Sequence, residues 1–377
     1  MEQRKERIRL LDILRGFAIL GTLGTNIWIF AHLGDLTYLT TYDYSGWWAK
    51  DDLIRMIVLF LVNGKLLGLL TIMFGVGLEL KYQQAIRKGN AWPGIYIWVS
   101  SLLFLEGLLH FTLVMEYDIL MSYGITAMIV AYIVKGGDGL ISITMKVLGS
   151  LHATAILGIL VISLIDANMT LRGSDEVIAL YRDGSWLQQV HYRLSHFVPL
   201  RLEAIFTIPM NVFLFLLGVR FMRAGVFSQD ENGKKQRDKL FKLGMFIGLP
   251  LNLLIFIPGG VFDLPVRYLF APLLSVGYLA IIGRMIQYTK LNWLWGLLEN
   301  AGKMSLSCYV MQNIICSILF YGWGFALGGK LDSVTIIVVW IGISVFQILF
   351  ATAWLQGFRF GPMETLRRRA IGIFDTR

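Results

Sequence analysis

The sequence has 377 residues, of which 56% are hydrophobic and only 16% are charged, and its mean hydropathy is +0.64. Soluble domains are about 45–50% apolar and about 25% charged, so this composition argues against a water-surrounded globule. The formal net charge of +9 reflects membrane topology in our interpretation, and nucleic acid is not an expected partner. Cys308 and Cys316 share one apolar stretch and offer neither a disulfide framework nor a metal-binding pattern.

Apolar runs long enough to cross a membrane recur along the whole chain. A hydrocarbon core needs about 20 apolar residues per helix, and runs without alternation favour helices over barrel strands. The first run carries Asp12 and Arg15 and is expected to stay in place as a span, not as a cleaved signal. We predict an all-α integral membrane bundle of about ten transmembrane helices, a single domain over 1–377, with spans near 10–31, 53–79, 93–114, 117–134, 141–165, 202–222, 241–258, 265–285, 297–320 and 334–357.

The distribution of lysine and arginine predicts the orientation of these spans. Basic residues favour cytoplasmic loops. Here they gather in the first nine residues, in the loop after the second span, in the run 220–242 and in the tail after the last span. A ten-span chain places all of these segments on one side, so both termini are expected in the cytoplasm.

The longest external segment, 166–200, has the pattern of an amphipathic helix. Trp186, Leu187, Val190, Leu194 and Phe197 recur at helical spacing, with polar residues between them. Such a helix is expected to lie on the outer membrane interface. A lid over a substrate cavity is the alternative.

The first span carries polar residues on one face. Asp12 and Arg15 are three residues apart and are expected to pair. Thr22 and Asn26 continue the same stripe about three turns further on. Ionisable groups at membrane depth are costly and mark functional or paired positions. The alternative is structural, with an ion pair near the interface and Asn26 bonding to a neighbouring helix.

A tight external hairpin between the third and fourth spans holds the second polar cluster. Glu106 and His110 lie four residues apart on the third span, Asp118 opens the fourth, and Tyr123 lies one to two turns deeper. Because few residues separate the helices, His110 and Asp118 are expected to face each other. A carboxylate that orients an imidazole creates a general base. A histidine that only bonds two helices together is the alternative.

Two further groups complete the candidate residues. Lys65 stands in the second span among glycines that suit close helix packing. It offers a cation to Asp118 or to a substrate, unless it snorkels outward. The ninth span carries a polar stripe that either lines a cavity or stitches helices together, formed by Asn300, Ser305, Tyr309, Gln312 and Asn313.

Several segments together resemble the YeiB-like bacterial membrane proteins. They occur in the family's order and read LDILRGFAILGTLGTNI, NGKLLGLLTIMFGVG, EGLLH with EYDILMSYG, GKMSLSCYVMQN and FRFGPMETLRR. That family looks related to the transmembrane acyltransferases, such as the lysosomal glucosaminide N-acetyltransferase and the bacterial surface-sugar O-acyltransferases. The resemblance implies a multi-pass protein of the bacterial cytoplasmic membrane. Its donor substrate would be cytoplasmic acyl-CoA, such as acetyl-CoA, and its acceptor would be a glycan, a lipid-linked sugar or a small molecule.

One motif departs from the acyltransferase pattern. The O-acyltransferases carry an arginine in the first span, followed after ten intervening residues by a histidine held to be catalytic. Here the same spacing joins Arg15 to Asn26, and an asparagine cannot act as a base. We therefore predict His110 as the base, with Asp118 or Glu106 orienting it.

The remaining candidates are expected to bind substrates. Lys65 or Asn26 would stabilise developing oxyanion charge. The other expected substrate-binding residues are Tyr123, Tyr309, Gln312 and Asn313. Asp12 and Arg15 are expected at the mouth for the donor, where Arg15 or the basic run 234–242 would meet the CoA phosphates. Membrane lipids are expected partners, no metal is expected, and self-association as a homodimer stays open.

Two other functions stay open from the sequence alone. A proton-coupled transporter or exporter would use Asp12, Glu106, His110 and Asp118 as a relay. A non-catalytic membrane scaffold would have lost the ancestral histidine. The sequence contains no HExxH, nucleophile elbow, P-loop or CxxC motif that would point to another class of enzyme.

The predicted orientation is testable with reporter fusions. Fusions after Lys88, Lys239 and Arg377 should report the cytoplasm, because each follows a basic segment, and one near Gly184 should report the outside. A cytoplasmic signal at Gly184 would contradict the ten-span topology.

Overall fold

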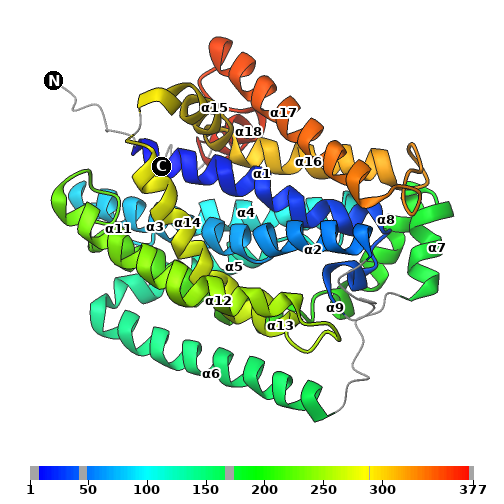
Figure 1. Ribbon diagram of the computed structural model, residues 1–377. Helices are drawn as coiled ribbons and strands as arrows, with labels where there is room; N and C mark the ends of the chain where they lie inside the picture. The colour runs from blue at the N-terminus through cyan, green and yellow to red at the C-terminus, as the bar shows by residue number, and fades with distance from the viewer. Residues whose placement is uncertain (1–7, 42–48, 166–173, 288, 373–377) are drawn as a thin grey trace.

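The computed structural model describes residues 8–41, 49–165, 174–287 and 289–372, and within these ranges the regular structure is entirely helical (Figure 1). The first half of the chain forms helices of the core, the outer helix α6 and the short helices α7–α9 at one end. These elements are α1 (Arg9–Ala31), η1 (Leu36–Leu39), α2 (Lys50–Val62), α3 (Lys65–Arg87), α4 (Ile95–Leu113), α5 (Leu120–Lys135), α6 (Gly137–Ile165), α7 (Asp175–Asp183), α8 (Trp186–Ser195) and α9 (Phe197–Leu200).

The second half of the chain completes the bundle on both sides of α1. Its elements are α10 (Ala204–Arg223), α11 (Glu231–Leu243), η2 (Gly244–Gly248), α12 (Leu249–Asn252), η3 (Leu253–Phe256), α13 (Asp263–Pro265), η4 (Val266–Phe270), α14 (Ala271–Met285), η5 (Thr289–Leu291), α15 (Asn292–Lys303), α16 (Ser305–Phe320), α17 (Ser333–Gly357) and α18 (Pro362–Gly372). Every predicted span coincides with one or more of these helical elements.

The helices form an all-α membrane bundle. In the described part of the chain, eight helical stretches are long and apolar enough to cross a membrane. The bent pair α15–α16 and the shorter apolar helix α5 occupy the two other predicted spans. That all ten segments cross the bilayer, with both termini inside, stays a prediction.

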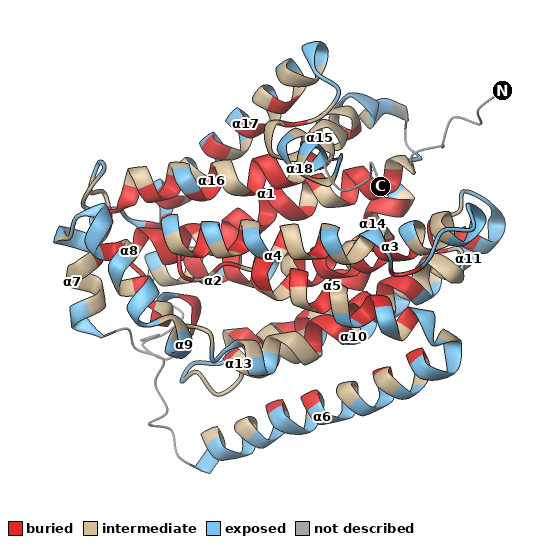
Figure 2. Ribbon diagram, turned by 180° about the vertical axis from the view of Figure 1, so that it is seen from behind, coloured by how far each residue is buried: buried red, intermediate tan, exposed pale blue. Residues whose placement is uncertain are grey.

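Burial separates the core of the bundle from its lipid-facing rim. The most apolar stretch of α1 is 83% buried, whereas that of α6 is only 11% buried. In Figure 2, α6 runs along the outside of the bundle while α1 lies among other helices. The exposed side chains of α6 include Ile143, Leu151, Val161 and Leu164, which suit a hydrocarbon environment.

Two of the predicted spans are broken inside the bundle. The predicted span 53–79 is divided at Asn63 and Gly64, between α2 and α3. Gly64 has φ +74°, and a Cβ atom there would lie 2.6 Å from the carbonyl oxygen of Arg267, so both the turn and the packing favour glycine. The predicted span 297–320 bends by 81° between α15 and α16.

The last helix, α18, folds back against this second break. Glu364 accepts hydrogen bonds from the backbone N–H groups of Leu306 (2.9 Å) and Ser307 (3.3 Å) and so caps the start of α16. Arg367 forms an ion pair with Glu106 of α4, with Nε 2.9 Å from Oε1. The ion pair offsets the cost of burying the charges of Glu106 and Arg367 among apolar helices.

The ion pair between α18 and α4 leads to a stability prediction. Arg367→Gln should lower the free energy of unfolding by up to about 3 kcal/mol, because it leaves the Glu106 carboxylate unpaired among apolar helices. The double variant Glu106→Gln/Arg367→Gln should regain most of that loss, and Arg369→Gln, an exposed position on the same helix, should have little effect. Thermal unfolding in detergent measures all three. Equal losses in the single and double variants would show that the pair is not the source of the effect.

Candidate functional site

A polar pocket lies at the end of the bundle that carries α7–α9. Its cavity volume is about 90 Å³. The wall is built by α1, the break between α2 and α3, the start of α5, the start of α10 and η4. Its polar lining includes Thr22, Thr25, Asn26, Asn63, Asp118, Ser122, Tyr123, Arg201, Asn211 and Arg267. A pocket this rich in hydrogen-bonding groups is unusual in an apolar bundle and suits a polar ligand.

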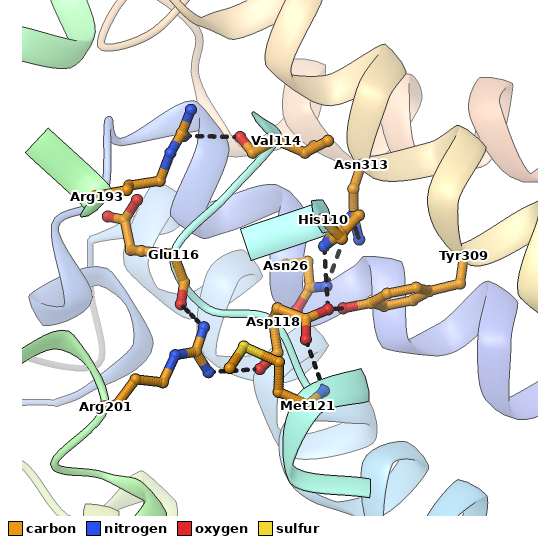
Figure 3. Close-up of polar contacts among 10 residues, drawn as sticks. All are labelled: Asn26, His110, Val114, Glu116, Asp118, Met121, Arg193, Arg201, Tyr309 and Asn313. Carbon is orange, nitrogen blue, oxygen red and sulfur yellow. Dashed lines mark hydrogen bonds and ion pairs between the residues drawn. The ribbon is translucent and has the colours of Figure 1, made fainter. Parts of the chain in front are cut away.

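His110 and Asp118 meet beside this pocket, as the short hairpin predicted (Figure 3). Nδ1 of His110 lies 3.1 Å from Oδ1 of Asp118, and both side chains are almost fully buried. The second oxygen of Asp118 accepts a hydrogen bond from the N–H of Met121 at 2.9 Å. This bond holds the carboxylate at the start of α5. Asp118 lines the pocket, and His110 lies behind it.

Two asparagines complete an arc from His110 back to the pocket wall. The amide nitrogen of Asn313 lies 3.2 Å from Nε2 of His110, and Asn26 donates to the Asn313 oxygen at 3.5 Å. With this amide orientation Asn313 donates to Nε2, so His110 carries its proton on Nδ1, toward Asp118. The arc begins at Asn26 and ends at Asp118, both of which line the pocket.

Two arginines that the sequence analysis did not single out fix the loop between α4 and α5. Arg193 of α8 donates to the carbonyl oxygens of Thr112 and Val114, each at 3.0 Å. Arg201 donates to the carbonyl oxygens of Glu116 at 2.7 Å and Asp118 at 3.0 Å. The four bonds hold the backbone that carries Asp118, and Figure 3 shows those to Val114, Glu116 and Asp118. No local pattern in the sequence pointed to this role for either arginine.

Glu116 forms a second buried acidic position in the same loop. Its carboxylate accepts a hydrogen bond from the hydroxyl of Tyr181 in α7. Burial raises the pKa of the Glu116 carboxyl, while the bond from Tyr181 and the charge of Arg193 oppose the rise. Burial also raises the pKa of Tyr181, so the phenol keeps the proton that it donates.

The helix predicted within 166–200 is present as α8, preceded by α7; residues 166–173 lie outside the described part. The buried face of α8 is polar, because Gln189 and Arg193 are fully buried. Its apolar residues Leu187 and Leu194 are exposed. The α7–α9 segment therefore covers the 112–118 loop with its polar face. That its apolar face lies on the membrane interface stays a prediction.

Three predicted binding residues lie around or behind the arc. Tyr309 donates to Oδ1 of Asp118 at 3.5 Å, and its ring lies 5.1 Å from that of His110. Tyr123 lines the pocket, and its hydroxyl lies 2.7 Å from Oγ1 of Thr71. Gln312 instead accepts from Gln347 of α17 at 3.3 Å, which fits the alternative that part of the stripe stitches helices together.

Glu106 and Lys65 are placed differently from the prediction. The Glu106 carboxylate is bound by Arg367, so it does not orient His110, because the fold brings α18 against this turn of α4. Nζ of Lys65 is buried without a hydrogen-bond partner and lies 5.8 Å from the ring centroid of Phe60. Lys65 does not line the pocket, whereas its neighbours Asn63 and Gly64 do.

The polar residues at the other end of α1 form the predicted pair. Nη1 of Arg15 lies 3.5 Å from Oδ1 of Asp12. The Arg15 guanidinium also approaches α3, 3.2 Å from the position that a Cβ atom on Gly77 would take. Neither residue lines the pocket beside Asp118. A donor-binding role for this pair stays a prediction.

The fold and site define a polytopic all-α membrane protein with a polar pocket inside the bundle. Residues 221–373 match the family model described as "Protein of unknown function (DUF418)". The chain is 26% identical to the uncharacterized protein YxaH of Bacillus subtilis, across 97% of this chain and 94% of that protein. It is 28% identical to the uncharacterized protein YeiB of Escherichia coli, across 97% and 96%. These similarities, which run along nearly the whole length of the two relatives, support a YeiB-like family for this chain.

The clamp on the 112–118 loop leads to a second prediction. Arg193→Met should destabilise the protein by about 2–3 kcal/mol, because it leaves two buried carbonyl oxygens without donors. Hydrogen exchange of residues 112–118 should become faster. The control Arg182→Met replaces an arginine whose side chain is 56% exposed and should leave both measurements unchanged. Unchanged exchange in Arg193→Met would show that α8 does not hold this loop.

Proposed function

We propose that this protein is a membrane acyltransferase that moves an acyl group from acyl-CoA to an acceptor bound in the pocket beside Asp118. The observation that carries the proposal is the buried arc Asn26–Asn313–His110–Asp118, which begins and ends on the pocket wall. An imidazole held by a carboxylate on one nitrogen keeps a lone pair on the other, and this is the arrangement of a general base.

The reaction follows from the position of that lone pair. The acceptor hydroxyl or amine binds at Asn26 and reaches Nε2 of His110 when the Asn313 amide moves aside. His110 takes its proton as the acceptor attacks the thioester carbonyl, so a carbon–oxygen or carbon–nitrogen bond forms and the carbon–sulfur bond breaks. The proton then passes to the departing CoA thiolate. Asp118 stabilises the imidazolium, and the amide of Asn26 donates a hydrogen bond to the developing oxyanion.

The donor is expected at the end of the bundle where α1 begins. Lys234, Lys235, Lys239 and Lys242 of α11 are exposed at this end, and Arg15 is partly exposed beside Asp12. Basic side chains of this kind suit the phosphates of CoA. The same lysines also suit anionic lipids, so donor binding is measured separately from turnover.

One observation favours a second candidate, a proton-coupled transporter. The spans α2–α3 and α15–α16 are both broken, and Asn63 and Gly64 at the first break line the pocket. Broken helices at a binding site inside the bundle are typical of transporters. In that case His110 and Asp118 would carry protons, and acyl-CoA would not bind.

Measuring acetyl transfer by single-residue variants tests the proposed transferase activity directly. Purified protein in liposomes receives radiolabelled acetyl-CoA and a bacterial lipid and glycan extract, and label transfer is measured. His110→Ala should lower the rate about 10²–10⁴-fold, the usual loss for one general base, without weakening acetyl-CoA binding. His191→Ala, at an exposed position on α8, is the matched control. Full activity of His110→Ala would place the chemistry elsewhere.

Asn26→Ala separates positioning from proton transfer. The variant should weaken acceptor engagement and keep residual turnover, because it removes hydrogen bonds worth about 1 kcal/mol each and not the base. Complete loss of turnover in Asn26→Ala, with full turnover in His110→Ala, would reverse the two roles. If acetyl-CoA does not bind and substrate-dependent proton entry into the liposomes is lost in His110→Ala, the transporter is the better account.

A further inference from the structure

Two arginines on the pocket wall form no ion pair with any described residue, although carboxylates line the same wall. Arg201 follows α9, and Arg267 lies in the π-helical turn η4. The hydrogen bonds of Arg201 go to the backbone carbonyls of Glu116 and Asp118, and its guanidinium carbon lies 4.2 Å from the ring centroid of Phe111. Its Nε is buried without a hydrogen-bond partner. Neither a carbonyl nor an aromatic ring cancels its charge.

Of the two guanidinium groups, that of Arg267 has fewer partners. Among the described residues, its recorded contact is with the ring of Tyr268, with 5.3 Å from the guanidinium carbon to the ring centroid, and it forms no ion pair or side-chain hydrogen bond there. Arg267 belongs to the candidate span Asp263–Met285. A guanidinium without an ion pair inside an apolar bundle is costly, and the charge of nearby Glu203 offsets only part of that cost. The pocket is the space into which a compensating group fits.

The carboxylates on the same wall already have partners. Asp118 is held by His110 and the N–H of Met121. Glu203 accepts a hydrogen bond from the hydroxyl of Tyr268, and Glu116 accepts one from Tyr181. Each acid is thus bonded to a neighbour, and the two guanidinium groups keep donors for a ligand. Planar guanidinium groups bind oxyanions through paired hydrogen bonds.

We propose that the pocket binds a ligand through a phosphate or carboxylate group held by Arg267 and Arg201. This proposal deepens the transferase proposal and rests on it in one respect: it makes the acceptor an acidic molecule, with its reactive hydroxyl or amine toward Asn26 and Asp118. The oxyanion belongs either to a soluble molecule, such as a sugar phosphate, or to the phosphate of a lipid carrier. Anion binding itself does not depend on transferase activity.

Binding measurements with matched charged and neutral probes test the proposal. Protein in nanodiscs is titrated with glucose 1-phosphate or glucose, and with an incorporated polyprenyl phosphate or polyprenol, while tryptophan fluorescence and thermal stability are followed. A charged probe should bind and its neutral counterpart should bind at least about tenfold more weakly. Binding of the soluble phosphate alone would identify a soluble ligand, and binding of the lipid phosphate alone would identify a lipid carrier.

Variants of Arg267 connect binding to this site. Arg267→Gln should weaken binding of the charged probe at least about tenfold, and Arg267→Lys should retain part of the affinity. Neither substitution should lower the stability of the ligand-free protein. Arg369→Gln is the surface control. Equal binding of charged and neutral probes, or marked destabilisation of ligand-free Arg267→Gln, would overturn the proposal. Retained label transfer in Arg267→Gln together with unchanged phosphate binding would reject the anion site and leave the transferase proposal standing.

Discussion

The contact between His110 and Asp118 is the interaction on which the candidate site depends. It joins the end of α4 to the start of α5, and the short link between these helices keeps both side chains at one depth. The N–H of Met121 holds the far oxygen of Asp118, and Arg201 holds its backbone carbonyl. The imidazole therefore meets a carboxylate whose position is set by two other groups, as general-base chemistry requires.

Burying the polar groups of this site among apolar helices costs free energy unless each group has a hydrogen-bond partner. The partners in turn hold the site rigid. Buried polar groups in a membrane bundle need partners, because lipid offers none. The fold supplies them from segments distant in sequence: Asn313 from α16 reaches His110, and Arg193 and Arg201 from the α7–α9 segment reach the 112–118 loop. The site is thus shared between the two halves of the chain, and residues 221–373, which match the family model, supply Asn313 and Arg267.

The sequence predicted the features that depend on local spacing. Apolar runs place a helix at each predicted span, three-residue spacing pairs Asp12 with Arg15, and the short hairpin brings His110 to Asp118. Features that depend on packing were not predictable in this way. Nothing in the local pattern shows that α18 returns to bind Glu106, so that carboxylate was misplaced beside His110.

The local sequence also does not show which face of a helix is buried in the bundle. In a soluble protein the apolar face of α8 would turn inward, but beside a membrane the polar face with Gln189 and Arg193 covers the polar loop. Lys65 shows the same limit. Its chemistry suggested a cation for the pocket, whereas the break at Gly64 turns its side chain toward Phe60.

The protonation pattern of His110 tests the central claim most directly. The protein contains five histidines, so nitrogen-15 NMR of histidine-labelled protein in lipid gives few signals, and the spectrum of His110→Gln identifies the one from His110. The hydrogen bond from Asn313 to Nε2 and the 3.1 Å contact between Nδ1 and Asp118 predict a proton on Nδ1 and a lone pair on Nε2. A proton on Nε2 with none on Nδ1 would contradict the account, because the base would then have no lone pair on the side that the acceptor reaches.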